Sequence, residues 1–239
     1  MRSYRLHGII IKRRNFLEKD RVLTLLSKES GKTEVLAKGA RRPGNRLSAS
    51  CDLATAARFY VQKTKTIDIV SEIEPFFRPD RIRGQYHKTE IISYALKIVD
   101  QLYEQDEPHA RTYKNLLDLL EAISFKMRQL LFLKFLLDVL EDLGAQPNFL
   151  TCPVCHREVT GKDEFMFAFS GGLTHQHCLD SECISISQKE IKLLRLLKLN
   201  NIRQSSNMKV DKATFEKTYQ IMQKYFEHEF GRMLPDNVM

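Results

Sequence analysis

Four side chains that can bind a metal ion occur as two short pairs in the second half of the chain. Cys152 and Cys155 have two residues between them, and so do His175 and Cys178. Each pair can turn both side chains toward one point, and Zn²⁺ takes four thiolate or imidazole ligands at the corners of a tetrahedron. Four protein ligands leave no position for a water nucleophile, so the pattern predicts a structural zinc site.

Other side chains compete for this role. His156, His177 and Cys183 lie close by in the sequence, and Cys183 could replace His175 as the fourth ligand. The cysteines could also be reduced thiols that hold no metal. The total of five cysteines is odd, and from the N-terminal residues we expect no secretory signal, which together favour a reducing cytoplasm over a disulfide framework. Cys51 is remote from the cluster, and we expect it to be a small buried apolar side chain.

Two basic segments are the candidates for contact with nucleic acid. The first is the run Lys12, Arg13 and Arg14, and the second is a glycine-containing loop with Lys38, Arg41, Arg42 and Arg46. Residues 1–88 hold 20 Lys and Arg against 9 Asp and Glu, a net charge of +11, whereas residues 89–239 hold 18 against 21. This asymmetry is expected when one module binds a polyanion, although a solvated basic surface without a partner would give the same charge distribution. Phe59 and Tyr60 could offer stacking faces or could fill a core.

The sequence lacks the patterns that carry catalysis. It has no phosphate-binding glycine loop of the Walker or dinucleotide type, no nucleophile elbow and no His-Glu-x-x-His zinc motif. No apolar segment approaches the roughly 18 residues that a membrane span needs. With 43% hydrophobic and 28% charged residues, the composition is that of a globular protein. We therefore expect a binding protein that is neither an enzyme nor a membrane protein.

The basic segments lie in a region with the patterns of β-strands. The β-branched, aromatic and alternating positions predict five strands, over residues 4–12, 21–27, 33–38, 58–62 and 66–73. The turns between them contain Ser30-Gly31 and Pro43-Gly44. Five short strands can close a small oligonucleotide-binding (OB) barrel.

From about Tyr86 the apolar period changes to that of a helix. Three amphipathic helices are expected before Gly144 and Pro147 stop the third. After the cysteine cluster, Ser187 and Glu190 form a capping-box pattern, and a last helix begins near Asp211. The predicted fold class is therefore α+β, with a five-stranded OB-fold barrel (1–80), an α-helical domain in two parts (81–150 and 185–239) and an inserted zinc-knuckle (151–184).

Three segments together resemble the bacterial RecO family of recombination and repair proteins. They are residues 8–32 (GIIIKRRNFLEKDRVLTLLSKESGK), the basic loop that begins Lys38-Gly-Ala-Arg-Arg, and the late Cys-x2-Cys with Gly-Gly-x-x-His-x-x-Cys. The resemblance spans nearly the whole chain in order. In the family, cysteine usually occupies the position of His175.

The resemblance implies a mediator that binds single- and double-stranded DNA, anneals complementary strands and works with RecR, with or without RecF. It also implies contact with the acidic tail of single-stranded DNA-binding protein (SSB) and help in loading RecA. Candidate side chains for the tail contact are Lys126, Arg128, Lys134 and Arg203. Alternatives are a zinc-containing RNA-binding or transcriptional regulator, an adaptor for an acidic protein, and a metal-dependent hydrolase using His177 or Cys183.

Overall fold

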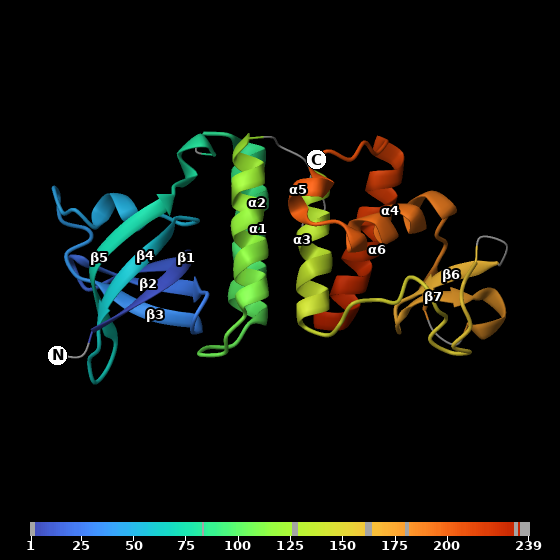
Figure 1. Cartoon of the computed structure of the whole chain (residues 1–239), viewed down its shortest axis with the longest axis horizontal. Helices are drawn as coiled ribbons and strands as arrows, with labels where there is room; N and C mark the ends of the chain where they lie inside the picture. The colour runs from blue at the N-terminus through green and yellow to red at the C-terminus, as the bar shows by residue number, and fades with distance from the viewer. Residues whose placement is uncertain are drawn as a thin grey trace. The chain divides into compact units, whose positions relative to one another are not determined.

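The structure is a computed structural model that describes residues 3–82, 84–125, 129–160, 164–179, 182–231 and 234. Packing contacts divide the chain into two compact units, Met1–Met127 and Arg128–Met239. The first unit holds a β-barrel and two helices, and the second holds the remaining helices and a small sheet (Figure 1).

The first unit begins with a closed five-stranded barrel. Its strands are β1 (Ser3–Phe16), β2 (Asp20–Ser27), β3 (Gly31–Ala37), β4 (Ala56–Gln62) and β5 (Asp68–Phe77). The order around the barrel is β1-β2-β3-β5-β4, and β1 closes the ring by pairing with β4. All neighbours are antiparallel except β3 and β5, where Val35 lies opposite Asp68. The predicted five-stranded barrel is confirmed.

Strand β1 is longer than the sequence pattern indicates. The register with β2 shifts between Ile10 and Lys12, which is a β-bulge, and pairing then continues to Phe16 opposite Asp20. The basic run therefore lies within the strand, whereas the pattern placed it at the strand's end. Residues 12–16 are all exposed, so this part of β1 lacks the alternation of apolar and polar residues that predicts a strand.

The barrel encloses an apolar core. Leu6, Leu23, Val35 and Phe59 are among its buried members. Phe59 is thus barrel filling and offers no stacking face. Cys51 is also fully buried there, as expected, and burial raises the pKa of its thiol to about 11.

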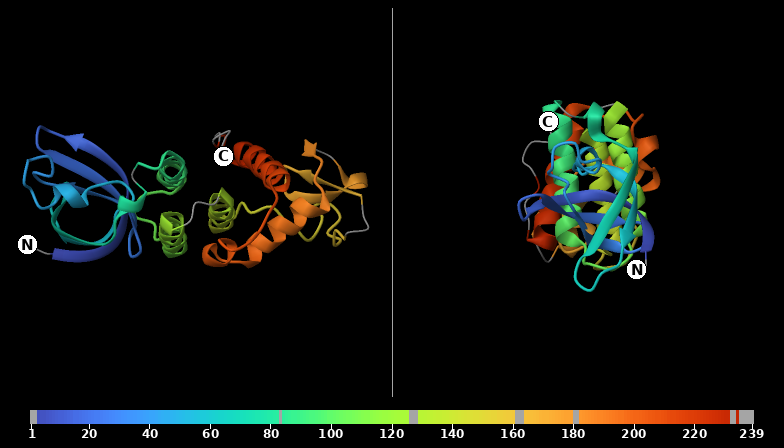
Figure 2. Two further views of the ribbon diagram at one scale, coloured as in Figure 1. Left: turned by 90° about the horizontal axis from the view of Figure 1, so that it is seen from above. Right: turned by 90° about the vertical axis from the view of Figure 1, so that its left-hand side faces the viewer.

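Two antiparallel helices, α1 (Tyr86–Leu102) and α2 (Ala110–Phe125), pack on the barrel (Figure 2). A short 3-10 turn, η2 (Pro79–Arg81), leads from β5 into α1. The loop between the helices meets the β2–β3 turn so closely that a Cβ on Gly31 would lie 1.8 Å from the Glu107 carbonyl oxygen. Gly31 also has φ +67°, a conformation that glycine adopts without strain.

The second unit packs helices around α3 (Gln129–Asp142), which is buried from Leu130 to Leu140. Its partners are α4 (Gln188–Leu199), α5 (Ile202–Ser205) and α6 (Lys212–Phe230). The predicted cap of α4 is present, because the Glu190 carboxylate accepts a hydrogen bond from Ser187 N. Asp211 caps the N-terminus of α6, because its carboxylate accepts a hydrogen bond from Thr214 N at 2.9 Å.

A small sheet in the second unit carries the cysteine cluster. Its strands are β6 (Phe165–Ala168), β7 (Gly172–His175) and β8 (Cys183–Ile184), and their order in the sheet is β7-β6-β8. A 3-10 turn, η3 (Gln176–Cys178), directly follows β7 in the chain. These strands of two to four residues are too short to show a period in the sequence. In the described parts of the chain, no helix is both long enough and apolar enough to cross a membrane.

Candidate nucleic-acid interface and metal centre

The basic loop after β3 is fastened to the β1–β2 turn. Arg41 N donates to the Lys19 carbonyl at 2.9 Å, and the Arg41 guanidinium donates to the Leu17 carbonyl at 3.4 Å. On the other side, Gly39 N donates to the Asp20 carboxylate at 2.7 Å. Two segments about twenty residues apart thus form one rim of the barrel, with Lys19 beside the loop cations.

The four predicted loop cations, Lys38, Arg41, Arg42 and Arg46, are all exposed. Among the described residues, no carboxylate lies within ion-pair distance of any of the four. Their charge is therefore available to an external anion. A 3-10 turn, η1 (Ser48–Ser50), ends the loop. The Ala49 carbonyl in this turn accepts a hydrogen bond at 2.8 Å from the guanidinium of Arg78, which directly follows β5.

The three predicted cations of β1 are placed differently, because each has an acidic partner. Lys12 Nζ lies 2.9 Å from Asp100 on α1, Arg13 lies 2.6 Å from Asp52, and Arg14 lies 3.3 Å from Glu34 on β3. These side chains remain between 37% and 56% exposed. Exposed ion pairs contribute at most about 1 kcal/mol, so a phosphate can compete for each cation.

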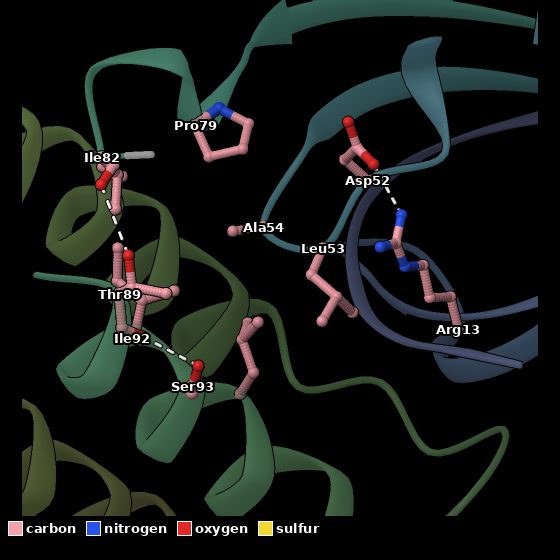
Figure 3. A pocket seen from close by; sticks show the side chains of 10 residues that line it. Arg13, Asp52, Leu53, Ala54, Pro79, Ile82, Thr89, Ile92 and Ser93 are labelled. Carbon is pink, nitrogen blue, oxygen red and sulfur yellow. Dashed lines mark hydrogen bonds and ion pairs between the residues drawn. The ribbon is translucent and has the colours of Figure 1, made fainter. Parts of the chain in front are cut away.

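Arg13 also borders a cavity of about 320 Å³ between the barrel and α1. Figure 3 shows the Arg13–Asp52 pair at one side of this cavity and Thr89 and Ser93 of α1 at the other. Its apolar lining residues include Leu53, Ile82 and Leu96. Sequence reasoning missed Asp52 and Asp100 as partners because they are remote from Arg13 and Lys12 in the chain.

The side chains predicted to stack on bases or to bind an acidic tail differ in how exposed they are. Tyr60 is partly buried, and its hydroxyl donates to Glu74 at 3.0 Å. Lys134, a candidate for the acidic tail, is buried and paired with Asp138, so it cannot meet an external partner. Arg203 is exposed on α5. Lys126 and Arg128 lie outside the described residues.

The four predicted metal ligands converge. The ligand atoms of Cys152, Cys155, His175 and Cys178 all lie within 4.8 Å of one another, so this cluster could hold a metal ion. Cys155 Sγ is 3.4 Å from His175 Nδ1. A Zn–S bond of about 2.3 Å and a Zn–N bond of about 2.0 Å put the ligands of one ion at such mutual distances, so the donor set fits Zn²⁺.

The backbone folds to present these ligands. His156 N donates to the Cys152 carbonyl and Cys152 N to the Arg157 carbonyl, both at 2.9 Å, which closes the first knuckle. The second knuckle follows β7, whose first residue needs to be glycine. A Cβ on Gly172 would lie 2.3 Å from the Asn148 carbonyl oxygen, and its φ is +114°.

The surroundings favour thiolate at two of the three cysteines. Burial raises the pKa of Cys152, but hydrogen bonds from the Thr174 hydroxyl and from backbone N–H groups outweigh it and lower the pKa to about 5. Hydrogen bonds from Arg157 lower the pKa of Cys155. Burial and the neighbouring thiolates raise the pKa of Cys178 to about 11, as expected of a third thiol that needs a cation to ionise.

These features define a class: an OB-barrel protein with an exposed basic rim and a Cys3His cluster in a separate helical unit. The family model described as "Recombination protein O N terminal" matches residues 1–77, and "Recombination protein O C terminal" matches residues 83–237. The chain belongs to the recombination protein O family, and hence to the proteins of DNA repair and recombination.

Curated relatives match nearly the whole chain. A DNA repair protein RecO from Roseiflexus sp. is 28% identical over 234 residues, which cover 97% of this chain and 82% of the relative. The DNA repair protein RecO of Bacillus mycoides is 26% identical over 233 residues, covering 95% of this chain and 92% of the relative. A Bacillus cereus relative has the same identity and coverage.

Proposed function

We propose that this protein is a recombination mediator that binds single- and double-stranded DNA at the barrel rim and anneals complementary strands without nucleotide hydrolysis. The observation that carries the proposal is the group of exposed loop cations, Lys38, Arg41, Arg42 and Arg46, which have no acidic partner among the described residues. Membership of a DNA repair and recombination family supports DNA as the polyanion.

Annealing follows from charge neutralisation. Each cation that meets a phosphate releases condensed counterions, so the binding constant falls with salt by about 0.7 to 0.9 in log–log slope per contact. A rim that neutralises two strands reduces their repulsion, and base pairing then selects the register. Lys12, Arg13 and Arg14 would join these contacts by exchanging their carboxylates for phosphates. No bond is made or broken by the protein, so the proposed role is not enzymatic.

The proposed partners follow from the family resemblance. We propose that the protein works with RecR, with or without RecF, contacts the acidic tail of SSB and helps to load RecA onto SSB-coated strands in the cytoplasm. Arg203 is the described candidate that remains exposed for the tail contact. In this scheme the barrel (1–80) binds DNA, and the helical parts (81–150 and 185–239) with the insertion (151–184) serve the protein partners.

The metal proposed for the cluster is a structural zinc ion held by Cys152, Cys155, His175 and Cys178. Zinc would connect the two knuckles through four protein ligands and would have no open coordination position. Without it, thiolates at Cys152 and Cys155 would repel each other. The protein part of this arrangement, including the hydrogen bonds to Cys152 from Thr174 and the backbone, holds the ligands in place.

The experiment compares a rim variant with a matched control. The rim variant is K38A/R42A/R46A, and the control K192A/K198A/K209A removes three exposed lysines from the second unit. Labelled single-stranded DNA, double-stranded DNA and RNA are titrated at several salt concentrations, and annealing is followed without ATP. We expect the rim variant to lose about 2 to 3 in salt slope and to anneal poorly, and the control to match the wild type.

An unchanged slope in a folded rim variant would overturn the proposal. Stronger binding of RNA than of DNA by the wild type would instead favour the zinc-containing RNA-binding regulator.

A further inference from the structure

The tip of the β1–β2 hairpin carries two apolar side chains that face solvent. Phe16 is 37% exposed and Leu17 is 75% exposed. Scattered exposed apolar residues are ordinary, but these two are adjacent at the outer end of β1 and directly follow the polar residues 12–15. Phe16 keeps a little over a third of its surface in solvent and Leu17 three quarters, and the protein itself does not use this apolar area.

The backbone at this tip is strained. Leu17 has φ +49°, in the left-handed region that glycine and asparagine favour and that costs most other residues about 1 kcal/mol or more. Packing does not compensate this cost, because the Leu17 side chain is the more exposed of the pair. A tight turn alone would be served better by glycine.

The strained tip is also hydrogen-bonded to the basic loop. Its carbonyl groups at Leu17 and Lys19 accept the two hydrogen bonds from Arg41, and Phe16 pairs with Asp20 across the hairpin. The apolar tip therefore lies beside the cations of the rim. Glu18 is the acidic residue of the turn, which disfavours a phosphate at the tip itself.

From this juxtaposition we propose that Phe16 and Leu17 contact unpaired bases, with Phe16 as a stacking face, while the adjacent cations hold the phosphates. The proposal deepens the proposed function, on which it rests, and makes the tip the element that distinguishes single-stranded from double-stranded DNA. Bases in a duplex are already stacked and cannot reach the tip. An aromatic face stacks on any base, so the contact is independent of sequence.

The test uses the full chain with Phe16→Ala, Leu17→Gly and, as a matched control, Phe76→Ala, which removes another exposed aromatic side chain of the barrel. We measure dissociation constants for single- and double-stranded DNA over a range of salt, quenching of a 2-aminopurine base in single-stranded DNA, and melting temperatures. Binding to vesicles of phosphatidylglycerol and phosphatidylcholine is measured in parallel.

We expect Phe16→Ala to weaken single-stranded binding about tenfold and to abolish most of the 2-aminopurine quenching, with double-stranded binding and the salt slope unchanged. Leu17→Gly should raise the melting temperature, since it relieves strain, and still weaken single-stranded binding. A merely structural residue would not separate these two effects. Phe76→Ala should bind as the wild type does.

Equal single-stranded binding by Phe16→Ala and wild type would overturn the proposal. So would equal losses on both kinds of DNA with a reduced salt slope, because the tip would then act through phosphate contacts. Loss of vesicle binding without loss of DNA binding would assign the tip to a lipid surface and overturn it as well. Absence of salt-dependent binding by the wild type to either DNA would contradict the proposed function itself.

Discussion

Lys134 and Asp138 form a buried ion pair one turn apart on α3, with Nζ 2.6 Å from Oδ1. Their side chains are 4% and 7% exposed. A charge removed from water needs its partner, whereas an exposed pair does not. The stability of the second unit therefore depends on this buried ion pair as well as on the apolar side chains of α3.

Replacing Lys134 with methionine should destabilise the protein by up to about 3 to 5 kcal/mol, because the buried Asp138 carboxylate loses the ammonium that lies 2.6 Å away. The measurement is urea unfolding followed by circular dichroism. The control is Lys114→Met, which breaks the i,i+4 pair with Asp118 on α2, where Lys114 is 69% exposed, and should cost no more than about 0.5 kcal/mol. Similar losses in the two variants would show that the α3 pair is effectively hydrated.

The acidic partners of β1 should restrain DNA binding. Asp52→Asn leaves Arg13 charged but removes the facing carboxylate, and Asp100→Asn does the same for Lys12. Each variant should bind DNA more tightly at low salt, with a log–log salt slope steeper by up to about 0.7 to 0.9. Fluorescence anisotropy over a salt series measures both quantities. Weaker binding by either variant would mean that these carboxylates position the cations for DNA.

The cysteine cluster should hold one zinc ion per chain, as measured by elemental analysis of the purified protein. Cys152→Ser should lose the metal, while His175→Cys should keep it, because four thiolates also suit Zn²⁺. Cys183→Ser is the control and should retain zinc; loss of zinc there would make Cys183 a ligand. Chelation should lower the stability of the second unit by about 4 kcal/mol relative to free zinc a thousandfold above its dissociation constant.

The N-terminal cap of α6 should make stability depend on pH. The hydrogen bond from Thr214 N lowers the pKa of the Asp211 carboxyl below its ordinary value of 3.8. Its contribution is present above that ordinary pKa and is lost as the pH falls through the lower folded-state pKa. Asp211→Ala should therefore be less stable than wild type near neutral pH, and the difference should shrink in acid. A difference in urea midpoint between Asp211→Ala and wild type that stays constant from neutral pH into acid would argue against the ionised cap.

Period and turn chemistry in the sequence were enough to predict the barrel and the main helices. The five strand patterns, the capping box at Ser187 and Glu190 and the start of the last helix near Asp211 are local signals, and the structure confirms each. The convergence of Cys152, Cys155, His175 and Cys178 was also predictable, because x2 spacing confines each pair to one knuckle.

What the sequence could not supply depends on distant contacts. Nothing near Arg13 indicates that Asp52 will face it, and nothing in the pattern around Lys134 shows that its charge is buried. The end of β1 was missed because a hairpin beyond the barrel wall has no buried face, so its residues lack alternation. The strain at Leu17 is likewise a property of the folded turn and of the Arg41 contacts that hold it.

The way the barrel closes affects how the chain folds during synthesis. The final seams join β1 to β4 and β3 to β5, so strands made first wait for partners that follow about thirty to sixty residues later. Until then, a nascent chain on the ribosome exposes two unpaired strand edges, which favour pairing with other chains. Translation pauses before β5 emerges should therefore promote aggregation, whereas pauses after it should leave both seams of the barrel closed.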